Sequence, residues 1–412
     1  MASLLTHQNL NRMASLEKGS WTSRTYREAV LKQIKTIIPY DAYCFNTVDP
    51  STLLSTGAVT EDGIEAIHKQ LFLNEYMEDD VHKYADLIQS GQYTAILQAS
   101  LPLHLHPESS SRYANILRPA GISDELRAVF VDQNACWGHL TLYRKQDAPA
   151  FSEEERSLMQ HWTASIALML RTTRLSLTDE LTDKSPDEPG IMLLDTSLEP
   201  VMNNAAARYW LSELHRLEQV GPDVLPRPIR AVCSHLLQST HTETKIVAEA
   251  GAGNGAGNDT GKDTGAGASA DPSPDHTLNP LSKVCVQLLD GRYLMLHASR
   301  MQHPEGTPTV IQRDHIAVWL EQALPQDVLP LLSERYGLSA RERELLAYVL
   351  RSFSSKEIAE AMHISVYTVQ DHLKSIFAKT EVSSRRELIW HFVSRFQLSG
   401  DSIIRRNVEM KL

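Results

Sequence analysis

Between residues 338 and 396, apolar side chains recur every three or four positions in four short stretches. Three stretches open with a Ser followed three residues later by a Glu: Ser339 with Glu342, Ser354 with Glu357, and Ser384 with Glu387. In such a capping box the hydroxyl and the carboxylate each satisfy a backbone amide at a helix start. Ser365 opens the remaining stretch as a single N-cap. The pattern predicts four short helices joined by short turns, as in a helix-turn-helix.

The third predicted helix has an apolar side and a polar side. Its apolar side is formed by Val366, Val369, Leu373, Ile376 and Phe377. The opposite side carries Tyr367, Gln370, Asp371 and Lys374. Amide, carboxylate and ammonium groups pair with adenine, cytosine and guanine edges respectively, so this side suits the major groove of DNA. The alternative is a solvated face on which Asp371 and Lys374 pair with each other.

Other residues of the segment suit the phosphate backbone. Thr368 lies in the first turn of the third helix, beside backbone amides that point toward anions. Arg385 and Arg386 open the fourth helix, where they are placed to hold the DNA backbone. The predicted DNA-contacting set is Ser365, Tyr367, Thr368, Gln370, Asp371, Lys374, Arg385 and Arg386.

The segment resembles the C-terminal DNA-binding domain of the LuxR family of bacterial transcription regulators. The resemblance rests on LSARERELL from Leu338, KEIA from Lys356, ISxxTVxxHLxxIFxK from Ile364 and SSRxEL from Ser383, and it covers about a seventh of the chain. It implies that Gln370, Asp371 and Lys374 face DNA bases. It also implies that two copies pair through the fourth helix on a two-fold-related site.

The segment departs from the family pattern at four positions. Gln370 stands where Lys or Arg is usual, so one positive contact is missing. Ser352, His363 and Glu381 stand where Gly is common, which predicts altered or strained turns. Residues 339–396 hold nine Lys or Arg against seven Asp or Glu, whereas the whole chain has a net charge of −11. We therefore expect weak sequence-independent DNA affinity and a need for dimerisation.

Residues 19–175 are predicted to form one α+β sensor domain after an N-terminal extension, residues 1–18. Alternating strand-like runs, AYCFNTV and LLSTGAV, follow a helical period, and the hairpin ELRAVFV and ACWGHLTLYR bends at residues 132–134. The stretch from GISDELRAVF through CWGHLTLYR to FSEEE resembles a GAF sensor domain. Ser152 and Glu155 form a further capping box before a long helix. Trp137 and Tyr143 line a ligand pocket or are ordinary sheet residues.

Residues 190–325, after a linker at 176–189, resemble a PAS-type sensor domain. IMLLD predicts a strand, EPVMNNAAARYWLSEL a turn into a helix, and VCVQLLDGRYLMLHASRM a hairpin that bends at Asp290-Gly291. TVIQRDHIAV predicts another strand. An insert at 250–275 holds seven of the 19 glycines and is predicted to be a disordered tether with no phosphate-binding role. The helix-turn-helix is assigned to 330–397 and a tail to 398–412.

Composition limits the kinds of site and activity that we expect. The four cysteines are scattered in apolar settings, which favours reduced core residues over disulfides or a zinc site. His104 and His106 have metal-like spacing but no accompanying ligand set, so no metal or cofactor is expected. No signal peptide or membrane span is predicted, which favours a cytoplasmic protein. No nucleophile-and-base pattern indicates an enzyme.

The sequence thus predicts a multidomain α+β protein: a GAF-like domain, a PAS-like domain and an all-α four-helix LuxR-type domain. The expected function is transcription regulation, with double-stranded DNA, a second copy of the chain, RNA polymerase and an unidentified effector as partners. The effector would be a small molecule or a protein. Two alternatives stay open: a scaffold whose helical tail contacts the transcription machinery, and an enzyme built on the front domains.

Overall fold

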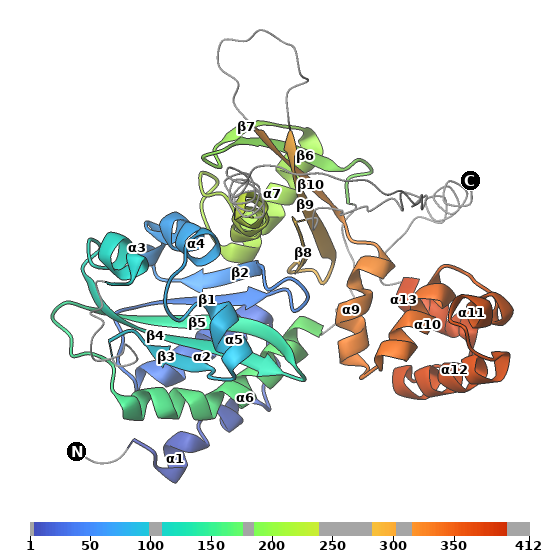
Figure 1. The fold of residues 1–412 in the computed structure, drawn as a ribbon, viewed down its shortest axis with the longest axis horizontal. Coiled ribbons are helices and arrows are strands. Elements are labelled where there is room, and N and C mark those ends of the chain that lie inside the picture. Colours follow the sequence, from blue (N-terminus) through green and yellow to red (C-terminus); the bar gives the residue numbers. More distant parts are fainter. Residues whose placement is uncertain (1–3, 99–108, 176–184, 239–281, 302–314, 394–412) are drawn as a thin grey trace, which may run out of the picture.

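A computed structural model describes residues 4–98, 109–175, 185–238, 282–301 and 315–393. These residues form two antiparallel five-stranded sheets with flanking helices, followed by a group of C-terminal helices (Figure 1). This confirms the predicted mixed α and β organisation with an all-α C-terminal domain.

The first sheet has the strand order β2-β1-β5-β4-β3. Its strands are β1 Ala42–Val48, β2 Ser55–Thr60, β3 Thr94–Ile96, β4 Ile122–Asp132 and β5 Ala135–Lys145. The β4–β5 turn contains Gln133 and Asn134 at φ of 50° and 63°, the left-handed conformation of a two-residue hairpin turn. The predicted hairpin is therefore confirmed. The pairing of β5 with β1 places His139 next to Asn46.

Helices cover both faces of this sheet (Figure 1). On one face, α2 Ser23–Lys35 and α6 Glu153–Leu175 pack on Phe45 and Phe130 in the largest apolar core. The predicted box at the start of α6 is present, because Ser152 and Glu155 bond each other's backbone amides at 2.8 and 3.2 Å. The other face lies under α3 Asp62–Glu65, α4 His68–Met77 and α5 Tyr84–Ser90.

The remaining short helical segments surround this first region. The structure has α1 at His7–Leu10, a 3-10 turn at Met13–Leu16 and a π-helical turn at Tyr113–Leu117.

The second sheet repeats the same order as β7-β6-β10-β9-β8. Its strands are β6 Gly190–Asp195, β7 Pro200–Asn203, β8 Ser282–Gln287, β9 Tyr293–Met301 and β10 His315–Gln322. The helix α7 Ala205–Glu218 and a helix at residues 227–238 pack against its buried face. One prediction needs correction here, because the segment before α7 contains the edge strand β7 and not a plain turn. The predicted last strand is confirmed from His315 onward, and its TVIQRD part lies outside the described residues.

Two side chains of the first region hold the edge of the second sheet. The Cys285 amide of β8 donates to Asp49 Oδ2 at 3.0 Å. Arg174, in the last turn of α6, donates to the Cys285 carbonyl at 2.7 Å and to the Thr56 hydroxyl of β2 at 2.6 Å. Since all four side chains are buried, this contact joins the two sheet-containing regions through an edge strand that would otherwise be unpaired at this point.

The C-terminal domain follows α9 Pro325–Arg335 and contains α10 Ala340–Leu350, α11 Ser355–Ala361, α12 Val366–Thr380 and α13 Arg385–Val393. The boxes at Ser339 and Ser354 form as predicted. Only one of the two hydrogen bonds of the third box, at Ser384, is formed. Ser384 accepts from the Glu387 amide at 3.2 Å, but the Glu387 carboxylate bonds the Ser383 amide and hydroxyl instead.

Several predictions concern residues outside the described part of the chain. These are His104 and His106, the insert at 250–275, most of the linker at 176–189, the segment TVIQRD and the tail at 398–412. All four cysteines are described, and each is buried with a free thiol. Across the described ranges, no helix has the length and apolar character needed to cross a membrane.

Candidate nucleic-acid interface

The helix α12 lies on an outer side of the C-terminal domain (Figure 1). Its polar side faces solvent. Ser365 caps it, accepting from the Thr368 amide at 3.0 Å. Tyr367 is 85% exposed, and Gln370, Asp371 and Lys374 are also exposed. The structure therefore brings six of the predicted DNA-contacting residues together on one accessible surface, which we call the α12 polar face: Ser365, Tyr367, Thr368, Gln370, Asp371 and Lys374.

The opposite side of α12 fixes the helix in the domain. Val369, Leu373 and Ile376 are buried in the core that α10 and α13 complete. Val366, predicted to lie on this apolar side, is instead 43% exposed, because it is the first residue of the helix and projects beyond the neighbouring turn. The other predicted apolar positions, Val369, Leu373, Ile376 and Phe377, are buried or half-buried as expected.

On the α12 polar face, Lys374 and Asp371 form an ion pair at 3.2 Å. Both side chains are exposed, so this pair contributes little stability and can open at low cost. Gln370 donates to the Ser355 hydroxyl of α11 at 3.1 Å, which orients its amide. The ion pair expected from the solvated-face alternative is therefore present, and both of its side chains remain exposed.

A buried carboxylate connects α10 to α12. Glu342 accepts from Ser375 at 2.6 Å and from Lys379 at 2.7 Å, both on α12, and from the Ser339 amide at 2.7 Å. Burial raises the pKa of Glu342, but these hydrogen bonds outweigh it and lower the pKa to about 2. Glu342 therefore fixes the position of α12 in addition to capping α10, a role that the capping motif alone did not indicate.

The two arginines at the start of α13 differ in their surroundings. Arg386 is exposed, whereas Arg385 is half-buried and donates to the Phe353 carbonyl between α10 and α11. This contact favours a structural role for Arg385 in the free protein. On the same helix Ile389 is half-buried and Trp390 is 68% exposed.

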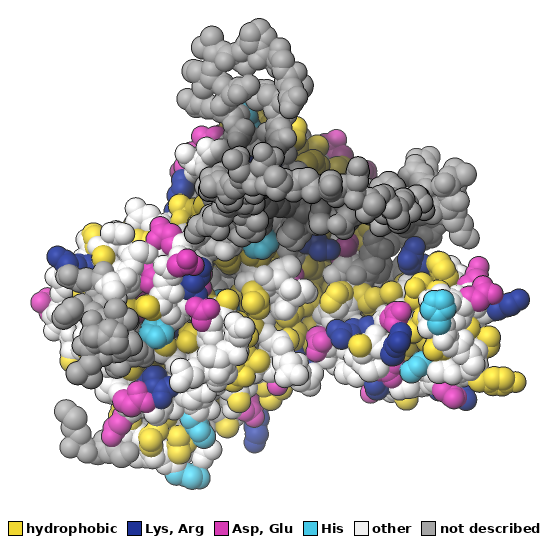
Figure 2. Space-filling model, in the orientation of Figure 1, with side chains coloured by type: hydrophobic (Ala, Val, Ile, Leu, Met, Phe, Trp, Pro, Cys, Tyr) yellow, Lys and Arg dark blue, Asp and Glu magenta, His cyan; other side chains and the backbone are white. Residues whose placement is uncertain are grey.

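Charges on the C-terminal domain are mixed. Figure 2 shows basic and acidic side chains interspersed on the visible face of this domain, with no uniformly basic surface. This agrees with the small excess of basic residues counted in the sequence. Sequence-independent attraction to phosphates is accordingly limited.

A second candidate site lies in the first region, between its sheet and the helices α4 and α5. A cavity of about 40 Å³ opens here, large enough for about three water molecules. Its lining combines apolar and aromatic side chains with several polar and charged ones. The lining residues are Cys44, Asn46, Ser55, His68, Leu71, Phe72, Glu75, Tyr76, Tyr84, Arg127, His139 and Tyr143.

One wall of this cavity is a stack of three side chains. Arg127 lies over the Tyr84 ring at 4.0 Å, and the Tyr84 and His139 rings stack with centroids 4.0 Å apart. Glu75 holds Arg127 through an ion pair at 2.7 Å. Burial lowers the pKa of His139 to about 3, so its ring is neutral. Its buried Nε2 meets no hydrogen-bond partner among the described residues.

The sequence left open whether Trp137 and Tyr143 line a pocket or are ordinary sheet residues. Tyr143 lines the cavity, but Trp137 is fully buried in the core on the other face of the sheet. The remaining lining residues were missed because strand pairing and helix packing bring them together from distant segments. Asn46 and His139 interrupt apolar strand runs, and that interruption was the available signal.

Comparison with known proteins identifies the C-terminal domain. Residues 337–392 match the family model described as bacterial regulatory proteins of the luxR family. This domain is a LuxR-family domain. The match covers α10, α11, α12 and most of α13, the elements that carry and position the α12 polar face.

Short parts of the chain are also similar to curated regulatory proteins. The chain is 45% identical over 64 residues to the monoamine regulon transcriptional regulator of Klebsiella aerogenes, covering 16% of this chain and 26% of that protein. It is 38% identical over 52 residues to the response regulator protein VraR of Staphylococcus aureus, covering 13% of this chain and 25% of that protein. The chain thus spans about a quarter of the length of these relatives.

Among solved structures, the GAF domain/HD domain protein from Geobacter sulfurreducens is 12% identical, with a TM-score of 0.28. The aligned part covers 40% of this chain and 100% of that chain. The GAF-like description of the first region therefore rests on its sequence pattern and on its antiparallel sheet with helices on both faces. Within the described residues, no group of three or more His, Cys, Asp or Glu side chains is placed to hold a metal ion.

Proposed function

We propose that this protein is a transcription regulator in which two sensor regions control a C-terminal LuxR-family domain that reads the major groove of DNA. The observation that carries the proposal is the α12 polar face. Its side chains project from a single capped helix, and Val369, Leu373 and Ile376 anchor that helix from behind. A short capped helix with an exposed polar side and a buried apolar side is the arrangement that enters a major groove.

The proposed role of each region follows the domain boundaries predicted from the sequence. Residues 19–175 and 190–325 act as GAF-like and PAS-like sensor regions, and residues 330–397 act as the DNA reader. The reader makes base contacts through Gln370, Asp371 and Lys374 and phosphate contacts through Thr368 and Arg386. Since the reader carries little excess positive charge, base contacts contribute a large share of its affinity.

The active form is a homodimer on a two-fold-related DNA site. Exposed Trp390 on α13 supports pairing through that helix, because large aromatic side chains are enriched in interface cores. Two readers also double the number of phosphate contacts, which offsets the small charge of each one. The bound dimer contacts RNA polymerase, and the protein acts in the cytoplasm, where its DNA is.

The effector site of the first region is the cavity under α4. Its volume and polar lining suit a small polar molecule, and His139 offers such a molecule an unpaired ring nitrogen. The effector acts by binding one arrangement of the regions more tightly than another, and the shift cannot exceed that difference in affinity.

Selection of duplexes from a random library by the full-length protein tests the proposed function. We expect enrichment of a two-fold-symmetric sequence whose half-sites are about one helical turn apart. Failure to enrich any sequence, together with binding that salt does not weaken, would support the scaffold alternative. A nucleotide-binding enzyme is tested separately by calorimetry of the full-length protein with common nucleotides.

A further inference from the structure

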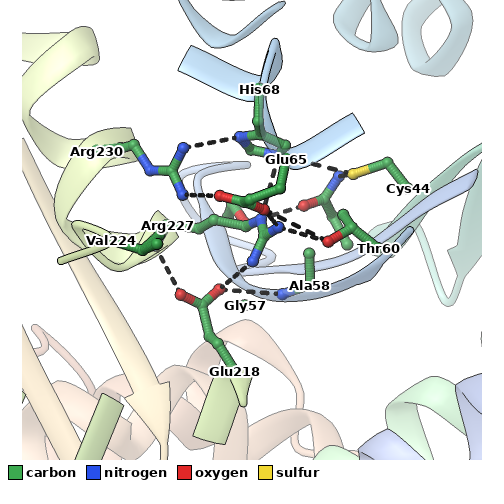
Figure 3. Close-up of polar contacts among 12 residues, drawn as sticks. Cys44, Gly57, Ala58, Thr60, Glu65, His68, Glu218, Val224, Arg227 and Arg230 are labelled. Atoms are coloured by element: carbon green, nitrogen blue, oxygen red, sulfur yellow. Dashed lines mark hydrogen bonds and ion pairs between the residues drawn. The ribbon is translucent and has the colours of Figure 1, made fainter. Parts of the chain in front are cut away.

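A buried cluster of charged side chains joins the first region to the helix at residues 227–238 (Figure 3). Glu65 and His68 come from the first region, Glu218 from the end of α7, and Arg227 and Arg230 from the following helix. Glu65 pairs with Arg227 and, at 2.8 Å, with Arg230. The cluster therefore crosses the boundary between the two sheet-containing regions.

Arg227 makes several hydrogen bonds and ion pairs within the cluster. It is fully buried, and besides Glu65 it bonds Glu218 at 3.3 Å and the Thr60 hydroxyl at 2.7 Å. Arg230 is less satisfied, because its buried Nε has no hydrogen-bond partner in the described part of the chain. Moving Arg230 therefore breaks fewer hydrogen bonds, and costs less free energy, than moving Arg227.

His68 lies between the two guanidinium groups. Its Nε2 accepts from Arg227 Nε at 3.2 Å, and its Nδ1 faces Arg230 at 3.3 Å. A neutral imidazole has one N–H and one acceptor nitrogen, so it can accept from one of these donors at a time. Burial, Arg227 and Arg230 lower the pKa of His68 well below its usual value, which keeps the ring neutral.

The same imidazole forms part of the cavity wall. His68 lines the cavity beside Cys44, whose Sγ lies 3.7 Å from His68 Nε2. Phe72, one turn later on α4, stacks near the ring with centroids 4.7 Å apart and also lines the cavity. A molecule in the cavity therefore touches the ring whose nitrogens face the second region.

We propose that His68 is a positioning residue that transmits occupancy of the cavity to the second sensor region. It does so by accepting from Arg227 at Nε2 in one tautomer or from Arg230 at Nδ1 in the other. The change of tautomer releases the ring proton from one nitrogen to water and takes up a proton from water at the other, so that one contact forms as the other is lost. The helix at 227–238, which packs against the second sheet, moves with the released arginine. This inference rests on the proposed effector site, but it does not require that the protein bind DNA.

Coupling of this kind is reciprocal, so a change at Arg230 must alter the cavity. Cys44 reports on the cavity, because a buried thiol is alkylated only when its surroundings open. The experiment measures alkylation of each cysteine of the full-length protein by N-ethylmaleimide, using peptide mass spectrometry. Cys136, buried elsewhere in the first region, reports global opening in the same sample.

Arg230→Lys keeps the charge beside Glu65 but removes the guanidinium that faces His68. We expect alkylation of Cys44 to accelerate about fivefold, with Cys136 unchanged. In a His68→Phe background, Arg230→Lys should change the Cys44 rate by less than about twofold, because the connecting nitrogens are gone. Arg216→Met, which removes an exposed arginine that pairs with Glu213 on α7 at 2.7 Å, is the matched control and should leave Cys44 unchanged.

Three results would overturn the inference: no acceleration at Cys44 in Arg230→Lys, equal acceleration of Cys136, or the same acceleration in the His68→Phe background. DNA binding by the same samples separates this failure from failure of the proposed function. If the protein binds no DNA but Cys44 responds to Arg230→Lys, the inference stands and the proposed function fails. If the protein binds DNA but Cys44 does not respond, the proposed function stands and the inference fails.

Discussion

Arg171 and Arg335 each donate to a backbone carbonyl in the last turn of the other's helix. Arg171 of α6 donates to the Glu334 carbonyl of α9 at 3.3 Å, and Arg335 of α9 donates to the Leu175 carbonyl of α6. The last carbonyls of a helix lack partners within it, so the two helices cap each other. Arg171 also pairs with Asp132 of the β4–β5 hairpin at 2.7 Å. This reciprocal capping connects the first region to the segment that carries the LuxR-family domain.

Removing either arginine should therefore loosen α9. We expect Arg171→Met and Arg335→Met each to lower the free energy of local opening by about 1 kcal/mol, and the double variant to lose less than the sum. Native-state hydrogen exchange of the α9 amides measures this. Arg156→Met, which breaks an ion pair near the start of α6, is the control. Additive losses would show that the two caps act independently.

Three turns of the LuxR-family domain store backbone strain. Ser352, His363 and Glu381 have φ of 66°, 55° and 57°, in the left-handed region that disfavours residues with a Cβ. Replacing each with Gly should raise the free energy of unfolding by about 0.5–1 kcal/mol, measured by denaturant titration. Glu360→Gly, at an exposed helical position in α11, should lower it by about the same amount. If all three Gly variants had a lower free energy of unfolding than the wild-type protein, these turns would not be strained.

Glu342 should make the C-terminal domain sensitive to acid. Its pKa in the folded state is about 2, below the usual 4.5, so its carboxylate stabilises the fold at higher pH. That stabilisation is fully present above about pH 5 and is lost as the pH falls toward 2. Glu342→Gln should lower stability at pH 7 by about 2 kcal/mol and flatten the loss between pH 5 and 2. Glu344→Gln, on the exposed side of α10, should do neither.

Asp371 is expected to limit non-specific binding. Its carboxylate neutralises Lys374 in the free protein and repels phosphates. Asp371→Asn should therefore increase affinity for random duplexes several-fold and make the salt dependence steeper, as measured by fluorescence anisotropy. It should also alter the selected DNA sequence if Asp371 contacts a base. Unchanged affinity and unchanged sequence preference would remove Asp371 from the DNA-contacting surface.

Local sequence signals predicted those elements whose stability is local. The boxes at Ser339 and Ser354 and the N-cap at Ser365 gave α10, α11 and α12, and the run AYCFNTV matched β1 from end to end. The three turns at Ser352, His363 and Glu381 were indicated by the resemblance to the LuxR family, in which Gly is common at these positions, and all three residues have positive φ.

Features formed by distant residues were missed. The edge strand β7 is short and exposed, so Val201 and Met202 show no alternation that would reveal it. The helix at 227–238 begins beside two prolines and was not predicted. Glu65 and Arg230 are 165 residues apart, and their pairing follows from how the two regions pack. Such contacts carry no local spacing that a sequence pattern can show.

The central claim is that the α12 polar face reads DNA bases. Its most direct test compares the affinity of full-length wild-type and Lys374→Ala proteins for the selected duplex and for a scrambled duplex. We expect Lys374→Ala to weaken binding to the selected duplex by about 1–3 kcal/mol, roughly 5–150-fold, with a much smaller effect on the scrambled one. Lys32→Ala, at an exposed position of α2, should change neither affinity. Equal affinity of the wild-type protein for both duplexes, or no loss in Lys374→Ala, would contradict the claim.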